Sequence, residues 1–215
     1  MTRTTPDQHY FTAQPASADL RKAITVTLRG RELPVTTAPG VFSPDRLDPG
    51  TSVLLRNVPS PPTSGNLLDV GCGWGPITLA MALESPNATV WAVDVNERAL
   101  DLVRRNAESL GLSNIRAVLP DDIPAGLSFD ALWSNPPIRI GKPALHALLS
   151  EWLPRVKPSA EPQSPQENTG AWLVVQKNLG ADSLARWIAE TYPHHSVTRE
   201  ASQQGYRILR VQRPA

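Results

Sequence analysis

The sequence contains a single cysteine, no excess of either charge and no long hydrophobic run. Cys72 alone cannot form an internal disulfide or a cysteine-rich zinc site, which fits a reducing compartment. The 21 basic and 20 acidic side chains leave a net charge of +1, too little for a strong overall field that attracts phosphate. The apolar runs are far shorter than the ~20 residues that span a bilayer, and the first residues lack the apolar core of a signal peptide. We therefore expect a cytoplasmic protein with no membrane segment.

The length and the prolines suggest how the chain is divided. With 215 residues, 40% of them hydrophobic, the chain is long enough for one globular domain with its own core. The 22 prolines are about twice the usual share and indicate rigid connections. Residues 59–62 (PSPP) cannot form regular structure. We place there the boundary between an N-terminal extension, residues 1–58, and a main domain, residues 59–215.

Short apolar runs alternate with helical patterns from residue 66 onward, which predicts an α/β fold with βαβ units and a mostly parallel sheet. Two final β-prone runs, 196–199 and 206–212, predict an antiparallel edge. Before residue 59, two β-prone runs predict a hairpin, and Asp48 followed by Pro49 predicts the start of a short helix. A proline-rich stretch, 158–165, is expected to be a loop. The other expected strands are 67–70, 89–93, 115–119, 129–134 and 171–176, and the expected helices are 50–57, 77–83, 98–110, 143–153 and 182–191.

A glycine-dense turn, residues 69–75 (DVGCGWG), joins the first of these strands to a helix. Glycines permit positive φ angles and let a ligand lie against the main chain at a helix N-terminus. About twenty residues further on, Asp94 ends the next strand, where a dinucleotide fold places the carboxylate that binds ribose hydroxyls. The turn lacks the G-x-G-x-x-G spacing, and this departure disfavours NAD.

A third element, Asn135-Pro136-Pro137-Ile138, closes a later strand. The two prolines have no N–H and a fixed φ, so they hold the Asn135 side chain and the nearby carbonyls in one geometry. A cluster of acceptors suits an amine that must present its lone pair while its hydrogens are bound. Methylation of a planar, weakly nucleophilic nitrogen has this requirement.

These three elements, in this order, resemble class I S-adenosylmethionine-dependent methyltransferases of the small-domain group. Residues 39–43 (PGVFS) and 47–51 (LDPGT) resemble the corresponding segments of ribosomal small-subunit RNA guanine-N2 methyltransferases. The resemblance extends from about Pro39 to the C-terminus. It implies a Rossmann-like fold with helices on both faces of the sheet, S-adenosyl-L-methionine as cofactor, RNA as partner and the exocyclic amine of a guanine in ribosomal RNA as acceptor.

The resemblance also implies roles for individual residues. Gly71, Cys72, Gly73 and Gly75 form the cofactor loop. The other cofactor contacts are Asp69 near the methionine amino group, Asp94 on the ribose diol, Val95 against the adenine face, and Asp121 or Asp122 at the adenine amino group. The catalytic pocket for the target base is formed by Asn135, Pro136, Pro137 and Ile138, with Phe42, Arg139 and Lys142 as further substrate contacts.

Two alternatives remain beside this hypothesis. An Asn-Pro-Pro element also serves methylation of a protein glutamine amide, and a non-catalytic RNA- or nucleoside-binding subunit could retain the fold without turnover. The presence of both Asp94 and Asn135 argues against the non-catalytic alternative. No metal site is expected, because the four histidines have no companions at metal-ligand spacing.

Overall fold

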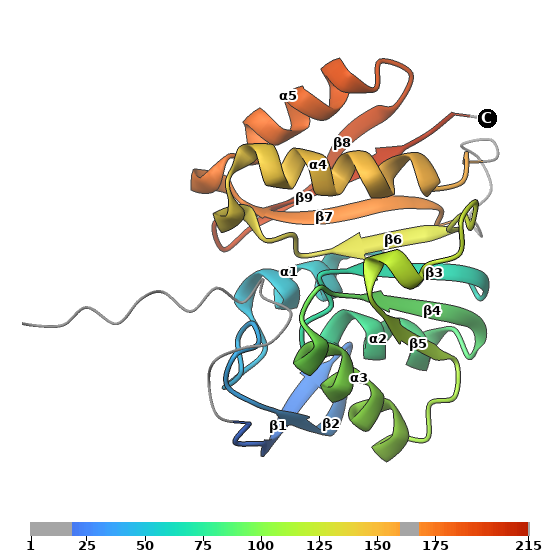
Figure 1. Ribbon diagram of the computed structural model, residues 1–215. Coiled ribbons are helices and arrows are strands. Elements are labelled where there is room, and N and C mark those ends of the chain that lie inside the picture. Colours follow the sequence, from blue (N-terminus) through green and yellow to red (C-terminus); the bar gives the residue numbers. More distant parts are fainter. Residues whose placement is uncertain (1–18, 160–167, 215) are drawn as a thin grey trace, which may run out of the picture.

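A seven-stranded sheet in the order β5-β4-β3-β6-β7-β9-β8 forms the centre of the computed structural model, which describes residues 19–159 and 168–214 (Figure 1). The N-terminal residues and most of the proline-rich stretch 158–165 lie outside the described residues. The sheet strands are β3 Ser64–Val70, β4 Asn87–Val93, β5 Ile115–Val118, β6 Ala131–Ser134, β7 Gly170–Gln176, β8 Ser196–Gln203 and β9 Tyr206–Gln212. The helices are α1 Pro49–Asn57, α2 Pro76–Glu84, α3 Glu97–Ser109, α4 Lys142–Trp152 and α5 Ala181–Thr191.

Strands β3 to β7 are parallel to one another, whereas β9 is antiparallel to both β7 and β8. The buried side chains of α1, α2 and α3 pack on one face of the sheet, and those of α4 and α5 pack on the other. This arrangement confirms the predicted mostly parallel α/β fold with an antiparallel edge. Because β9 is antiparallel, its first residue, Tyr206, lies opposite Gln176 at the carboxyl edge of the parallel strands.

The order in which strands are added to the sheet reverses between β3 and β6, which are parallel neighbours. From β3 the chain proceeds outward to β4 and β5, and it then returns to β6 on the other side. In open α/β sheets, ligands bind outside the carboxyl ends of strands at such a switch point. The residues that follow β3 and β6 are Gly71 and Asn135, and the Ser134 hydroxyl donates to the Val70 carbonyl across this gap at 2.7 Å.

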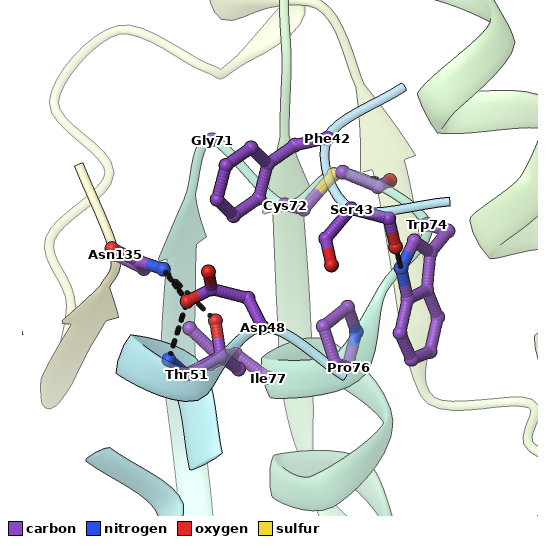
Figure 2. Close-up of a pocket in the computed structure, with 11 residues that line it drawn as sticks. Phe42, Ser43, Asp48, Thr51, Gly71, Cys72, Trp74, Pro76, Ile77 and Asn135 are labelled. Atoms are coloured by element: carbon purple, nitrogen blue, oxygen red, sulfur yellow. Dashed lines mark hydrogen bonds between the residues drawn. The ribbon is translucent and has the colours of Figure 1, made fainter. Parts of the chain in front are cut away.

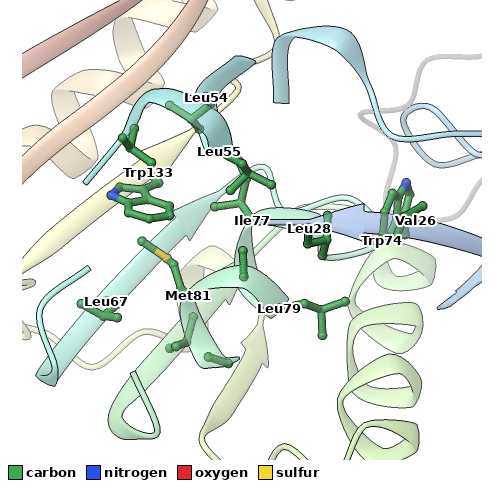
Figure 3. Packing of buried hydrophobic residues seen from close by; sticks show 14 of the residues in the cluster. Val26, Leu28, Leu54, Leu55, Leu67, Trp74, Ile77, Leu79, Met81 and Trp133 are labelled. Atoms are coloured by element: carbon green, nitrogen blue, oxygen red, sulfur yellow. The ribbon is translucent and has the colours of Figure 1, made fainter. Parts of the chain in front are cut away.

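The predicted N-terminal hairpin is present as β1 Lys22–Leu28 and β2 Arg31–Thr37. Arg29 and Gly30 have φ angles of 47° and 82°, as the tight two-residue turn of a hairpin requires. Alternate hairpin side chains, including Val26 and Leu28, are buried in one hydrophobic cluster with residues of α1, α2 and β3 (Figure 3). Residues on both sides of position 58 therefore share a core, and the division at that position stays a prediction.

Most predicted elements are observed with end shifts of one to three residues. Strand β6 begins at Ala131, two residues later than expected, and Phe129 instead bridges Val156. Strand β8 is longer than expected and contains an irregularity between Arg199 and Ala201. Over 19–159 and 168–214, no helix is long and apolar enough to cross a membrane, and no group of three or more metal-ligating side chains occurs.

Three 3₁₀ turns also bear on the site and its surroundings. The first, η1 Pro120–Asp122, follows β5, and the second, η2 Ile138–Ile140, directly follows the two consecutive prolines. The third, η4 Lys177–Leu179, follows β7. All three therefore lie after the carboxyl ends of parallel strands, which is the edge that carries the candidate site.

Candidate active site

A pocket at the carboxyl ends of β3 and β6 is lined by three segments that are distant in the sequence (Figure 2). One segment precedes and begins α1, the second joins β3 to α2, and the third follows β6. The lining residues are Phe42, Ser43, Asp48 and Thr51 from the first, Gly71, Cys72, Gly73, Trp74, Pro76 and Ile77 from the second, and Asn135 from the third. The pocket thus brings together the glycine loop and the Asn135 element, as the sequence predicts.

The glycine loop presents an open surface above its main chain. Gly71 and Gly73 have φ angles of 74° and 54°. A Cβ built on Gly73 would meet no atom within 4 Å, and one on Gly71 would meet only Pro137 Cδ at 3.9 Å. Gly75 differs, because a Cβ there would lie 3.1 Å from the Val103 side chain, so this glycine permits close packing of α2 on α3. The space over the first two glycines is therefore suited to a ligand.

Asp94 connects this loop to the start of α3. One carboxylate oxygen accepts from the Gly73 amide at 3.0 Å, and the other accepts from the Asn96 amide at 2.9 Å. Burial raises the pKa of Asp94, while these backbone N–H donors oppose that shift. The next residue, Val95, leaves 42% of its surface exposed, which is unusual for an apolar side chain beside a buried strand. An anchored carboxylate next to an exposed apolar surface fits a nucleoside, with its ribose on the former and its base on the latter.

Asp69 lies beneath the loop and does not line the pocket. Its side chain is fully buried, and one oxygen accepts from the Thr78 amide at 2.9 Å and from the Thr78 hydroxyl at 2.6 Å. Burial raises the pKa of Asp69 to about 7. Its other oxygen has no hydrogen-bond partner among the residues that the structure describes. Asp69 thus holds α2 against β3, and its contact with a methionine amino group stays a prediction.

Asn135 is held by α1 through two hydrogen bonds. Its Nδ2 donates to Asp48 Oδ2 at 2.8 Å and to Thr51 Oγ1 at 3.0 Å (Figure 2). The sequence predicts Asp48 only as the N-cap of α1 and gives Thr51 no role in the site. The segment LDPGT that contains both residues was a signal of family resemblance, but its contact with Asn135 depends on how α1 packs on the sheet.

The segment after the hairpin is fixed against the glycine loop and α3. The Trp74 indole Nε1 donates to the Ser43 carbonyl at 3.1 Å, and Asn96 Nδ2 donates to the Gly40 carbonyl at 2.8 Å. These bonds place Phe42, which is 47% exposed, at the pocket. The loop thus reaches the site, whereas the hairpin itself packs beside α2 and α3. Trp74 is 1% exposed and is part of the core as well as of the lining.

Most of the remaining predicted residues do not line this pocket. Cys72 does line it, and burial raises the pKa of its thiol well above the usual value, which keeps the sulfur protonated and unreactive. The other residues lie outside the pocket lining and differ in burial. Four are exposed: Asp121 and Asp122 in η1, Arg139 in η2 and Lys142 at the start of α4. Pro136 is buried, and Pro137 and Ile138 are half-buried.

An open parallel sheet with a glycine loop after β3 and a carboxylate after β4 defines a Rossmann-like, nucleoside-binding α/β domain. Within that class, residues 32–210 match the family described as Methyltransferase small domain, and the chain belongs to this family. The protein is therefore an S-adenosylmethionine-dependent methyltransferase, as the sequence motifs indicated.

Individual relatives differ in how much of their length this chain covers. It is 32% identical over 209 residues to the uncharacterized protein YbxB of Bacillus subtilis, which covers 96% of this chain and 98% of the relative. It is 36% identical over 124 residues to ribosomal RNA small subunit methyltransferase C of Aeromonas hydrophila, but it spans only 35% of that protein.

Among solved structures, a T. thermophilus 16S rRNA N2 methyltransferase in complex with AdoMet and guanosine superimposes with a TM-score of 0.73. The match covers 91% of this chain and 51% of that one at 22% identity. At this identity the comparison establishes a shared fold.

Proposed function

We propose that the protein methylates the exocyclic amine of a guanine in ribosomal RNA. The observation that carries this proposal is the position of Asn135, whose amide lies in one pocket with the open side of the glycine loop. A donor bound over the loop and an acceptor bound at Asn135 would be neighbours. Names of relatives add support, since several curated rRNA small-subunit methyltransferases match more than half of this chain.

The cofactor half of the site has a carboxylate, an apolar surface and an open main chain. In this proposal Gly71 and Gly73 lie under the cofactor, Asp94 accepts from the ribose hydroxyls, and Val95 packs on the adenine. One of Asp121 and Asp122, in η1 at the end of β5, accepts from the adenine amino group. Bound S-adenosylmethionine supplies an activated methyl group, so the protein needs to align the reactants and requires no strong general base.

The acceptor half presents hydrogen-bond acceptors to an amine. Asn135 and the carbonyls beside Pro136 would bind the amine hydrogens and direct the nitrogen lone pair toward the methyl group. The nitrogen gains positive charge as its bond to the methyl carbon forms and the sulfur–carbon bond breaks, and it then loses a proton to water. Phe42, exposed at the pocket, offers a ring on which a planar base can stack.

A labelled methyl donor tests the proposal. The protein is incubated with it and with separate RNA, ribosomal-subunit and protein fractions, and the label is located in each. We expect label in RNA, at the exocyclic amine of guanine. Label in protein alone would show glutamine-amide methylation instead, and cofactor binding without any transfer would identify a non-catalytic subunit.

Two variants separate the halves of the site. Asp94→Ala should weaken cofactor binding by about 1.5–3 kcal/mol for each hydrogen bond lost to the carboxylate. Asn135→Ala should lower kcat and leave cofactor affinity nearly unchanged, because Asn135 acts on the acceptor. Calorimetry and steady-state kinetics measure both effects, and the reverse pattern would exchange the two assigned roles.

A further inference from the structure

We propose that Asp48 is a positioning residue that fixes which end of the Asn135 amide faces the acceptor, with Thr51 as a second anchor. The consequence for catalysis rests on the proposed function, but the contact itself does not. An amide has an oxygen that accepts and a nitrogen that donates, and the two ends have nearly the same shape. Only one of the two orientations can bind an amine through its hydrogens.

The chemistry of Asp48 selects that orientation. An ionised carboxylate accepts hydrogen bonds and has none to donate. Turning the Asn135 amide over would place its oxygen at the position of Nδ2, 2.8 Å from a carboxylate oxygen, which is repulsive. The assignment of Nδ2 toward α1 therefore follows from the partner. Both N–H groups of this nitrogen have an oxygen within reach, at Asp48 and Thr51, so the amide has only its oxygen left for the acceptor.

Asp48 is itself held rigidly. Its Oδ2 caps α1 by accepting from the Thr51 amide at 2.9 Å, and Pro49 fixes the backbone of the first turn. Asp48 and the Tyr206 ring occupy the space beside Gly50, because a Cβ built on Gly50 would lie 3.0 Å from Asp48 Oδ2 and 2.8 Å from a Tyr206 ring carbon. The absence of a side chain at Gly50 thus lets both the carboxylate and the ring approach the first turn of α1.

The negative charge of Asp48 also makes the Asn135 oxygen a stronger hydrogen-bond acceptor. A carboxylate that accepts a hydrogen bond from the amide nitrogen pushes electron density from that nitrogen toward the amide oxygen. The oxygen then carries more negative charge and accepts hydrogen bonds more strongly. The acceptor nitrogen gains positive charge during methyl transfer, so the benefit is greatest in the transition state. Asp48 therefore acts through Asn135 without touching the substrate.

Two pairs of variants test this role while preserving the fold. Asp48→Ser keeps a preferred N-cap but is too short to reach Asn135, whereas Asp48→Asn keeps the length and removes the charge. Thr51→Val removes the hydroxyl at nearly constant volume, and Thr51→Ser restores it. We expect kcat to fall about 10- to 100-fold in Asp48→Ser and by a smaller factor in Asp48→Asn. In Thr51→Val we expect kcat to fall about tenfold, and in Thr51→Ser we expect it to recover. Cofactor affinity should stay within about twofold throughout, as for an interaction confined to the acceptor.

A substrate-independent measurement accompanies the kinetics. In ¹⁵N-correlated spectra, the Asn135 side-chain NH₂ signals, assigned by their loss in Asn135→Ala, should shift toward free-amide values in Asp48→Ser. Glu190→Gln, which alters an exposed carboxylate on α5, should leave them unchanged. Unaltered Asn135 signals in Asp48→Ser, or an undiminished kcat, would overturn the inference. If the wild type methylates no RNA, the proposed function fails while the amide signals still decide whether Asp48 positions Asn135.

Discussion

Within residues 19–159 and 168–214, Thr78 is the only hydrogen-bond partner of the buried Asp69 side chain, and a buried carboxyl group with so few partners is costly. Both of its hydrogen bonds come from Thr78, in the first turn of α2, so the interaction fixes the helix that follows the glycine loop. The cost is visible in the pKa, which burial raises from 3.8 to about 7. The geometry of the loop thus depends on a carboxyl group whose pKa lies close to neutral pH.

The stability of the protein should therefore depend on the ionisation of Asp69. Between about pH 4 and 7 the folded protein binds a proton here that the unfolded chain does not, so the free energy of unfolding falls as pH rises through this range. Asp69→Asn keeps the acceptor for Thr78 and removes the ionisation. We expect it to be about 1–2 kcal/mol more stable than the wild type at pH 8, and no more stable at pH 5.

Denaturant unfolding at several pH values measures this difference. Asp45→Asn is a suitable control because the Asp45 side chain is 75% exposed. Parallel pH profiles for the wild type and Asp69→Asn would show that Asp69 does not titrate in this range.

At the scale of elements, the sequence predicted what depends on local pattern. The alternation of apolar runs and helical periods gave the sheet and its helices, and Asp48 followed by Pro49 gave the start of α1 because a cap and a first-turn proline are local signals. The bond from Asn135 to Asp48 joins residues 87 positions apart, and no periodicity reports on such a contact. The same limit applies to the hairpin, because its local pattern predicts two paired strands but not the packing of its apolar side with α2 and α3.

The hairpin contributes to the main core, and its side chains should be costly to truncate. Leu28 is 1% exposed and lies in the cluster that contains Trp74 and Met81. Leu28→Ala should lower the free energy of unfolding by about 2–5 kcal/mol, since it removes buried methyl groups and leaves a cavity. Leu20, just before the hairpin, is 69% exposed, and Leu20→Ala should change stability by less than about 0.5 kcal/mol. Thermal unfolding compares the two, and equal losses would contradict the packing described here.

For the whole molecule, a net charge of +1 means that the RNA binding we propose would depend on a few local cations. Arg139 and Lys142 are exposed just after the Asn-Pro-Pro element. If both bind phosphates of a single strand, Arg139→Ala with Lys142→Ala should weaken binding and reduce the salt slope by about 0.7 for each contact. The matched double variant Arg31→Ala with Arg186→Ala, also at exposed positions, should preserve the slope. Kd values measured across a salt series give these slopes. Equal slopes in the wild type and in the Arg139→Ala, Lys142→Ala variant would exclude both side chains from the interface.

The two halves of the pocket come from different parts of the chain. In the proposed site, the donor half comes from one stretch of the chain, from the glycine loop to the η1 turn after β5. The acceptor half is assembled from Asp48 before α1 and Asn135 after β6, with Tyr206 of β9 beside Gly50 in the first turn of α1. Substitutions in the acceptor segments can therefore accumulate without altering the residues beneath the donor. Such a division lets one inherited donor site serve new acceptors during evolution, and it makes α1 and the β8–β9 turn the natural segments to exchange in a chimera designed to change substrate.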